Sequence, residues 1–567
     1  MHGAVRSDHD VLPPARPLGV PRQAPPRRRA QPVTAPSRTP DDDDWWRHAV
    51  VYQVYPRSFS DADGDGVGDL PGITARLPHI ADLGVDALWI TPFQPSPHVD
   101  QGYDVSDYCG VDPLFGTLAD FRELLDAAHA RGLRVLMDIA PNHCSSEHPR
   151  FQAALAAAPG SAEREFFHFA DGPDGETPPN NWVSSFGDRS WTRAHPESDK
   201  DQQWYLHIFS PAQPDWNWRN PAVGDFFEDV LRFWFGLGVD GLRVDVAHGL
   251  YKTPGLPDAE DPEAVARGLR FNPHLTDQEE IHDVWRRWRR IANEFAPARV
   301  LVGEVNLDAD RAARLVRHDE LHQAFAYPFV KVPWDAAAWA EKAERLIEEH
   351  GTYGAAPAWC IENHDVARSV TRYGGGKQGA ARSRAALLAM MALPGGAYLY
   401  QGQELGLPEV DVPLADRLDP MWARAGISRD GARIPLPWTT SATGTYGFSP
   451  DGGAASWLPT PSFWGSFAIE AQRADEDSTL RYVSAVVELR RRLISDGTLA
   501  AGLATRWRIG EDEALVCERG ERFALVMAMG SRPVPLPEGR VLLCSGSLTE
   551  DGLLPPDTAA WVKRSAG

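Results

Sequence analysis

The sequence predicts an α/β protein: a (β/α)8 TIM barrel with an inserted subdomain after the third strand and a C-terminal antiparallel β-sandwich domain. Three observations lead to this prediction. Eight short apolar runs alternate with amphipathic helical stretches, which is the pattern of a parallel barrel. About a hundred residues rich in Pro, Gly, Asn and Trp separate the third and fourth runs, from His143 to Leu242. After about Asp496 the helical period gives way to short alternating segments, which are typical of antiparallel strands.

The predicted strands and helices follow one another in regular order. Each strand is a short run of apolar and β-branched residues, and each helix has apolar residues at helical spacing. The strands are predicted to begin at Val50, Ala87, Leu133, Gly241, Arg299, His322, Ala358 and Ala397. The clearest helices begin at Leu118, Asp283, Ala340, Arg382 and Thr479. The expected domains are 45–143 and 221–495 for the barrel, 144–220 for the insertion and 496–567 for the C-terminal domain.

The first 44 residues are predicted to be a disordered tail. They hold nine prolines, the run Arg27–Arg29 and the run Asp41–Asp44, and few residues that could form a core. No apolar segment of about 7–15 residues marks a secretory signal, and no stretch reaches the ~20 apolar residues that cross a bilayer. The five cysteines lack the close pairs of a disulfide framework or a zinc site. These features predict a cytoplasmic protein that does not bind membranes.

Composition narrows the class of ligand. The 567 residues include 57 basic and 79 acidic ones, a net charge of -22, which argues against nucleic acid or an anionic membrane as the main partner. The chain also has 20 Trp, 13 Tyr and 22 Phe. Most of these belong to the core, but exposed aromatic rings beside carboxylates suit a flat, neutral, hydroxylated ligand such as a sugar. The sequence does not indicate an oligomeric state.

Ionisable residues follow four of the eight predicted strands. They are Asp138 and His143 after the third strand, Arg243 and Asp245 on the fourth, Glu304 after the fifth, and His364 and Asp365 after the seventh. In such a barrel the chemistry lies at the carboxyl ends of the strands, so we expect these side chains to meet. Two carboxyls about 5–5.5 Å apart across a glycosidic bond act as nucleophile and general acid, with net retention at the anomeric carbon. The acid needs a raised pKa, which burial and neighbouring carboxylates would supply.

At these residues the sequence resembles the α-amylase superfamily, glycoside hydrolase family 13, and most of all its α-glucosidase and oligo-1,6-glucosidase branch. The matching segments are DIAPNH ending at His143, GLRVDVAH around Asp245, GEVN around Glu304 and ENHD ending at Asp365. QPDWN, residues 213–217, resembles the short motif that separates this branch from neopullulanase-like relatives. The resemblance covers nearly everything from Trp45 to the C-terminus.

The resemblance implies roles for four of these residues. Asp245 is implied as the nucleophile that forms a glycosyl-enzyme, and Glu304 as the acid and then the base. Asp365 would hold substrate hydroxyls and favour the distorted, oxocarbenium-like sugar. Arg243 stands two residues before Asp245 and so on the same face of the strand. It should orient that carboxylate and help to keep it ionised.

Five further residues are implied to bind substrate. His143 and His364 resemble the family's histidines that bind sugar hydroxyls in the −1 subsite; hydrogen-bonded packing residues are the alternative. Tyr103 and Asp104 resemble the stacking tyrosine and its partner carboxylate, and Arg433 matches the arginine of the family's RDxxRTPMQW segment. An Asp104–Arg433 pair would hold the outer hydroxyls of the non-reducing sugar and block extension beyond it. That implies a pocket and an exo-acting enzyme, whereas without the resemblance two unrelated surface charges are the simpler interpretation.

A cluster of acidic residues near the start of the barrel is a candidate metal site. Its oxygen donors alternate as at the start of an EF-hand, but Gly72 occupies the position of the bidentate Glu, so it is not one. It resembles the metal loop of oligo-1,6-glucosidases, which implies one structural Ca²⁺. The implied ligands are Asp61, Asp63, Asp65, Asp69 and the Val67 carbonyl. Four carboxylates within nine residues would repel one another without a cation.

Together these features predict a retaining, exo-acting α-glucosidase that releases glucose from maltose or short malto-oligosaccharides, without an organic cofactor. Linkage cues disagree. Val246, directly after Asp245, accompanies α-1,6 activity in this branch, whereas RVDVAHGLYK resembles actinobacterial α-glucosidases that act on α-1,4 substrates. The longer match favours α-1,4, because one apolar side chain changes discrimination by only about 1–3 kcal/mol. Glu362, where the family commonly has Ser, has no explanation in the sequence.

Three alternatives remain. The first is an oligo-1,6-glucosidase, and the second is a glucosyl transferase or isomerase, such as a trehalose or isomaltulose synthase, on the same site. The third is a non-enzymatic relative, such as the ectodomain of amino-acid transporter heavy chains. The three carboxylates and the missing anchor argue against the third.

Overall fold

The computed structural model describes residues 44–564, apart from 199, 267–271 and 442–443. The predicted disordered tail lies outside the described residues except for Asp44. The described residues belong to one compact unit that begins at Asp41. None of the described helices is both long and apolar enough to span a bilayer.

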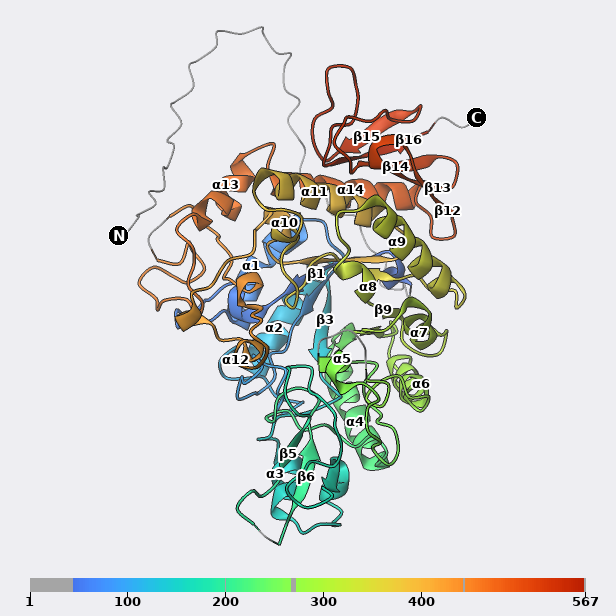
Figure 1. Ribbon diagram of the computed structural model, residues 1–567. Helices are drawn as coiled ribbons and strands as arrows, with labels where there is room; N and C mark the ends of the chain where they lie inside the picture. The colour runs from blue at the N-terminus through green and yellow to red at the C-terminus, as the bar shows by residue number, and fades with distance from the viewer. Residues whose placement is uncertain (1–43, 199, 267–271, 442–443, 565–567) are drawn as a thin grey trace, which may run out of the picture. The chain divides into compact units, whose positions relative to one another are not determined.

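Eight parallel strands form a barrel at the centre (Figure 1). They are β1 (Val50–Val54), β2 (Ala87–Ile90), β3 (Arg134–Ile139), β7 (Gly241–Val244), β8 (Val300–Gly303), β9 (Gln323–Ala324), β10 (Ala358–Trp359) and β11 (Gly396–Tyr400). They pair in the order β10-β11-β1-β2-β3-β7-β8-β9, and a parallel bridge from Phe325 to Ala358 joins the two ends. The predicted barrel is therefore confirmed. Its strands are buried on both faces, as expected where helices cover a parallel sheet.

Helices lie around these strands, apart from α3, which lies beside β5 and β6 (Figure 1). They are α1 (Leu70–Asp82), α2 (Leu118–His129), α3 (Pro149–Ala156), α4 (Pro221–Leu237), α5 (Pro262–Ala266), α6 (Ile281–Ala292), α7 (Ala309–Ala313), α8 (Tyr327–Val330), α9 (Ala336–Gly351), α10 (Ser369–Arg372), α11 (Gly376–Ala392), α12 (Pro420–Ala425), α13 (Ile469–Ala474) and α14 (Thr479–Ser495). Thr117 and Asp120 form a capping box at the start of α2, and Gly238 ends α4 in the left-handed conformation. Helix α11 begins before the predicted Arg382, because its polar first turns carry no apolar periodicity.

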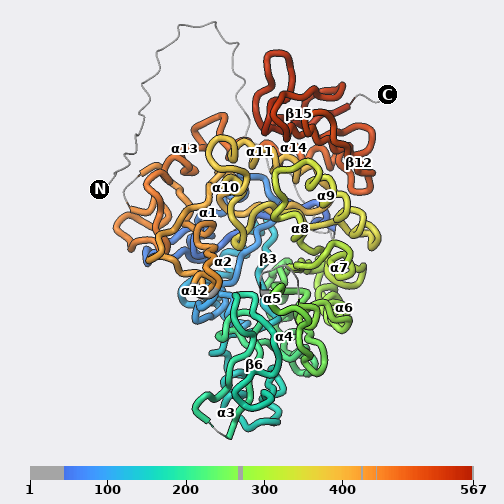
Figure 2. Tube along the Cα trace, viewed as in Figure 1, coloured from blue at the N-terminus to red at the C-terminus, as the bar shows by residue number. Residues whose placement is uncertain are grey.

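The chain between β3 and β7 leaves the barrel and forms a small subdomain. It contains β4 (Phe169–Asp171), β5 (Trp191–Arg193) and β6 (Gln203–Leu206), which pair antiparallel in the order β4-β6-β5. Figure 2 shows the chain passing through α3 and β6 before it returns along α4. The predicted insertion after the third strand is thus present.

The C-terminal region is antiparallel, as predicted. β12 (Thr505–Ile509), β13 (Ala514–Arg519), β14 (Phe523–Ala528), β15 (Arg540–Cys544) and β16 (Thr558–Lys563) form one sheet in the order β12-β13-β14-β16-β15. One face packs on α11, where Trp561 Nε1 donates to the Leu388 carbonyl at 3.0 Å. Residues around Val534 and Leu554, joined by an antiparallel bridge, cover the other face. The second layer of the predicted sandwich is therefore a loop rather than a second sheet.

Candidate active site

The carboxyl ends of the barrel strands surround a small pocket of about 70 Å³. It is lined by Asp100, Tyr103, His143, Phe186, Phe209, Asp245, Val246, Glu304, Asp365 and Arg429. The structure brings the three predicted carboxylates together here, since Asp245 follows β7, Glu304 follows β8 and Asp365 lies in the turn after β10. Phe186 and Phe209 come from the inserted subdomain, which therefore forms part of the wall.

Arg243 on β7 connects the carboxylates from beneath the pocket. Its Nη1 lies 2.7 Å from Asp245 Oδ1 and 3.1 Å from Asp138 Oδ1, and its Nη2 lies 2.9 Å from Glu304 Oε2. The guanidinium is 2% exposed. A buried cation with five donors in a fixed plane is thereby shared among three carboxyl groups, which holds Asp245 and Glu304 in one orientation.

Asp245 and Glu304 hydrogen-bond each other and titrate as a pair. Burial and the charge of Glu304 raise the pKa of Asp245 well above its usual value. Burial also acts to raise the pKa of Glu304, but the charge of Arg243 outweighs it and lowers that pKa. This polarity is opposite to the expectation of an ionised Asp245 and a raised pKa at Glu304. It arises because the two buried carboxyls hydrogen-bond each other while Arg243 pairs with both.

Asp365 is held ionised by two arginines. Its Oδ1 lies 2.9 Å from Arg429 Nη1 and 3.0 Å from Arg433 Nη2, and its Oδ2 lies 3.3 Å from His364 Nε2. Burial alone would raise its pKa, but His364, Arg429 and Arg433 lower it below the usual value. The carboxylate can therefore accept hydrogen bonds from sugar hydroxyls at any pH near neutrality.

The expected Asp104–Arg433 pair is replaced by a pair four residues earlier on each segment. The Asp104 carboxylate accepts hydrogen bonds from the backbone N–H groups of Val99 (2.8 Å) and Asp100 (3.0 Å), and it does not line the pocket. Arg433 lies behind Asp365 and donates to the His364 carbonyl at 2.8 Å. The pair that does line the pocket is Asp100 and Arg429, 2.9 Å apart.

The sequence contained a signal for this missed pair. Two aspartates, Asp100 and Asp104, lie four residues apart around QGYD, and the arginines at 429 and 433 are spaced in the same way in RDGAR. Either residue of each pair could therefore have been predicted to line the pocket. Asp419 completes the group, since its Oδ1 lies 2.8 Å from Arg429 Nη2. Arg429 thus bridges Asp100, Asp365 and Asp419 at the wall of the pocket.

The two predicted histidines have different places. His143 lines the pocket, whereas His364 is fully buried behind Tyr103, with their rings stacked at 5.5 Å and an interplanar angle of 3°. His364 Nε2 lies 2.8 Å from the Tyr103 hydroxyl, which donates to Asp138 Oδ2 at 2.9 Å. Burial lowers the pKa of His143 and lowers that of His364 to about 3. Both rings are therefore neutral near pH 7, and His364 orients Tyr103 and Asp365.

Val246 lies directly after Asp245 in an unusual backbone conformation. Its φ is 45°, a region that β-branched residues rarely adopt. In this conformation its N–H donates to Glu304 Oε2 at 3.1 Å. Strained backbone of this kind persists where the surroundings hold it in place, so the turn after β7 itself helps to position Glu304.

Glu362, unexplained by sequence, has a definite place in the structure. It is buried, and its Oε1 accepts a hydrogen bond from the Ser369 N–H at 2.9 Å, while its Oε2 lies 3.5 Å from Arg368 Nη1. Arg368 Nη2 in turn donates to the Ala432 carbonyl at 2.8 Å. Glu362 therefore ties the turn that carries Asp365 to the segment that carries the two arginines.

The acidic loop before α1 brings three of its predicted ligands together. Carboxylate oxygens of Asp61, Asp63 and Asp65 lie within 4.8 Å of one another. Asp69 is placed differently, because it caps α1 and its carboxylate accepts from the N–H groups of Gly72 and of residue 62. Oxygen ligands at this spacing suit Ca²⁺.

A second region near Asn142 holds a buried ammonium group. Lys252 Nζ lies 2.9 Å from Asp215 Oδ2 and donates to Asn142 Oδ1 at 2.8 Å, and all three residues are fully buried. Asp215 belongs to the inserted subdomain and Lys252 to the segment after β7. This ion pair therefore joins the subdomain to the barrel with an internal cation.

The fold and the three converging carboxylates define a glycoside hydrolase. The family model described as "Alpha amylase, catalytic domain" matches residues 53–497, and the chain belongs to this family. A probable α-glucosidase of Rhizobium meliloti is 40% identical over 488 residues, which cover 81% of this chain and 84% of the relative. An oligo-1,6-glucosidase of Parageobacillus thermoglucosidasius is 31% identical over 79% of this chain and 84% of the relative. The crystal structure of the α-glucosyl transfer enzyme XgtA superimposes with a TM-score of 0.81 at 34% identity, covering 92% of this chain and 99% of that one.

Proposed function

We propose that this glycoside hydrolase is a retaining, exo-acting α-glucosidase that releases glucose from the non-reducing end of maltose or short malto-oligosaccharides. The observation that supports this most is the group formed by Arg429 with Asp100, Asp365 and Asp419 beside the three carboxylates. Such a group presents fixed acceptors and donors to the outer hydroxyls of a terminal sugar. It also occupies the space that a longer chain would need beyond that sugar.

The reaction proceeds by double displacement. Asp245 attacks the anomeric carbon as the bond to the leaving oxygen breaks, and Glu304 gives that oxygen a proton. Glu304 then takes a proton from water, which attacks the same carbon and frees Asp245. The pair needs one proton in total, and in this proposal the entering sugar parts the two carboxyls and leaves that proton on Glu304.

Charge at the pocket favours a neutral substrate. Among the described residues that line the pocket, Arg429 is the one cationic side chain, and three carboxylates already bind it. A phosphorylated sugar would therefore meet acidic groups without a free partner. Phe186 and Phe209, whose rings lie 5.4 Å apart, offer an apolar surface for the second sugar ring.

A transferase is the second candidate, supported by the likeness to XgtA. Hydrolysis and transfer share the glycosyl-enzyme and differ only in whether water or a sugar attacks it. We propose that the enzyme cleaves α-1,4 linkages, because the segment RVDVAHGLYK resembles that of α-glucosidases that act on them. Cleavage of α-1,6 linkages is the alternative.

One substrate panel tests these proposals. The enzyme is incubated with maltose, isomaltose, sucrose, trehalose and starch, and products are followed by NMR from the first turnovers. Our proposal expects glucose from maltose with the α-anomer formed first, and little release from starch. Initial release of the β-anomer would contradict retention, fast internal cleavage of starch would contradict exo action, and disaccharide isomers as main products would identify a transferase.

The mechanism predicts a bell-shaped dependence of kcat/KM on pH. The site works only while the Asp245–Glu304 pair holds one proton. Because the pKa of Asp245 is raised, activity falls as the pH rises above a value higher than usual for Asp. Because the pKa of Glu304 is lowered, activity falls on the acid side only below the usual value for Glu. His364 contributes neither limb, since burial lowers its pKa to about 3.

The measurement is kcat/KM for maltose from about pH 4 to 9, which reports the pKa values of the free enzyme. Asp138 is the competing group, because burial raises its pKa to about 7. The Asp138→Asn variant separates the two explanations. Loss of the alkaline limb in that variant would assign the limb to Asp138 and contradict the prediction.

We also propose that Asp61, Asp63 and Asp65 bind a structural Ca²⁺. Added Ca²⁺ is then expected to raise the thermal unfolding midpoint, by the equivalent of about 2.7 kcal/mol at 100 times the Kd. Asp63→Asn should abolish this shift. Asp174→Asn is the matched control, because Asp174 is exposed and also accepts backbone N–H bonds in a turn. An equal calcium shift in Asp63→Asn would disprove the site.

A further inference from the structure

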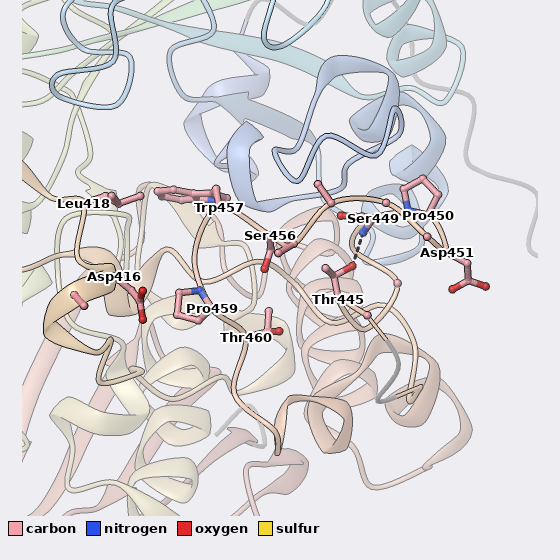
Figure 3. A pocket seen from close by; sticks show the side chains of 17 residues that line it. Asp416, Leu418, Thr445, Ser449, Pro450, Asp451, Ser456, Trp457, Pro459 and Thr460 are labelled. Carbon is pink, nitrogen blue, oxygen red and sulfur yellow. Dashed lines mark hydrogen bonds between the residues drawn. The ribbon is translucent and has the colours of Figure 1, made fainter.

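A second hollow, larger than the catalytic pocket, lies in the segment after β11. Its volume is about 810 Å³, and all its lining residues fall between 415 and 460 (Figure 3). We call it the outer groove. Its size lies in the range of small-molecule sites, about 300–1,000 Å³. Among the described residues, none that lines the outer groove also lines the catalytic pocket.

The lining of the outer groove is amphiphilic, and its described residues include no basic side chain. Leu418 and Trp457 supply apolar surface, and Figure 3 shows them next to each other at one end of the view. Hydroxyl groups of Thr445 and Ser449 and the carboxylate of Asp451 lie further along. Acceptors and hydroxyls beside an indole suit a neutral polyhydroxylated ligand, whereas an anion would meet carboxylates without a cation to bind it.

One hydroxyl of the groove lining is buried. Ser449 is 8% exposed, and its Oγ has no hydrogen-bond partner, although its N–H donates to Thr445 Oγ1 at 2.8 Å. A buried hydroxyl without a partner is unfavourable for the free protein.

The indole of Trp457 is fixed in place and connects to the catalytic pocket. Its Nε1 donates to Ser58 Oγ at 3.0 Å, and its ring lies 6.3 Å from Tyr55. Tyr55 stacks on His364 at 5.8 Å, and His364 stacks on Tyr103 of the pocket. A rigid aromatic surface loses little entropy when a sugar ring binds, and this row of rings places it close to the site where the same class of ligand is cleaved.

We propose that the outer groove is a second saccharide-binding site, which binds a neutral α-glucan oligosaccharide independently of the catalytic pocket. The inference goes beyond the proposed function, since it concerns binding and holds whichever linkage is cleaved. The probe is maltotriose, and the protein is the full chain with its catalytic pocket saturated by 1-deoxynojirimycin. Binding is measured by titration calorimetry and by ligand-observed NMR.

The variants Leu418→Asp and Trp457→Ala are each expected to weaken maltotriose binding at least tenfold. Leu418→Asp changes a side chain that is 54% exposed, so it does not threaten folding. Leu414→Asp is the matched control, because Leu414 is 66% exposed on the same segment but outside the groove, and it should bind like the wild type.

Two outcomes would overturn the proposal. One is the lack of saturable maltotriose binding once the inhibitor fills the catalytic pocket. The other is equal affinity in wild type, Leu418→Asp and Trp457→Ala. Stronger competition by glucose 6-phosphate than by glucose would contradict the assigned ligand class. Because the readout is binding, a failure of maltose hydrolysis would leave this result unaffected.

Discussion

Replacing Asp245 by Asn is expected to lower kcat for maltose about 10⁴–10⁶-fold, the range seen when a nucleophile is removed. The amide keeps the size of the side chain and can still accept the 2.7 Å hydrogen bond from Arg243, so the fold should persist. It cannot form the glycosyl-enzyme, because an amide oxygen is a poor nucleophile toward the anomeric carbon. Steady-state kinetics and a thermal melt of the same preparation measure both effects.

The matched control is Asp104→Asn. Asp104 is also buried, but it accepts from the backbone N–H groups of Val99 and Asp100 and does not line the pocket. The amide oxygen can accept one of these two bonds, and Asp104 does not line the pocket, so activity should change less than tenfold. If Asp245→Asn retained activity comparable to this control, the proposed nucleophile would be rejected.

Glu304→Gln has the second largest expected effect. Loss of general acid and base catalysis costs about 10²–10⁴-fold, and maltose hydrolysis should fall at the upper end, because its leaving group needs a proton. The p-nitrophenolate of a p-nitrophenyl α-glucoside leaves without being protonated. Formation of the glycosyl-enzyme should therefore proceed, and its hydrolysis should become rate-limiting. A burst of p-nitrophenol followed by slow turnover is the expected signature.

Azide distinguishes the two catalytic roles. With Glu304→Gln, azide needs no base to attack the glycosyl-enzyme, so turnover should recover and the product should be the α-glucosyl azide. With Asp245→Asn no such intermediate forms, so the α-azide should be absent. Recovery of activity with formation of the β-azide in Glu304→Gln would mean that the roles of the two carboxyls are exchanged.

The catalytic carboxylates were predictable because their signal is local. Asp245, Glu304 and Asp365 each follow a short apolar run, and in a parallel barrel the ends of such runs meet at one mouth. The barrel brings these strand ends together, so the three side chains reach one pocket. Arg243 was predictable for the same reason, since alternate residues of a strand share a face.

The groups that surround these carboxylates were not predictable in the same way. Asp100 and Arg429 lie 329 positions apart in the chain, and like charges four residues away made Asp104 and Arg433 equally plausible. Lys252 beside Asn142 and Glu362 behind Asp365 gave no signal either, because their partners come from other segments.

The amino-acid sequence by itself determined the barrel, the insertion, the antiparallel C-terminal region and the strand-end carboxylates. These follow from periodicity and order, which the chain carries locally. Only the tertiary structure decided which aspartate meets which arginine, how Arg243 pairs with both Asp245 and Glu304, and how Trp457 comes to line the outer groove. Such choices depend on distances between segments far apart in the chain and on burial, which sets the strength of every charge interaction.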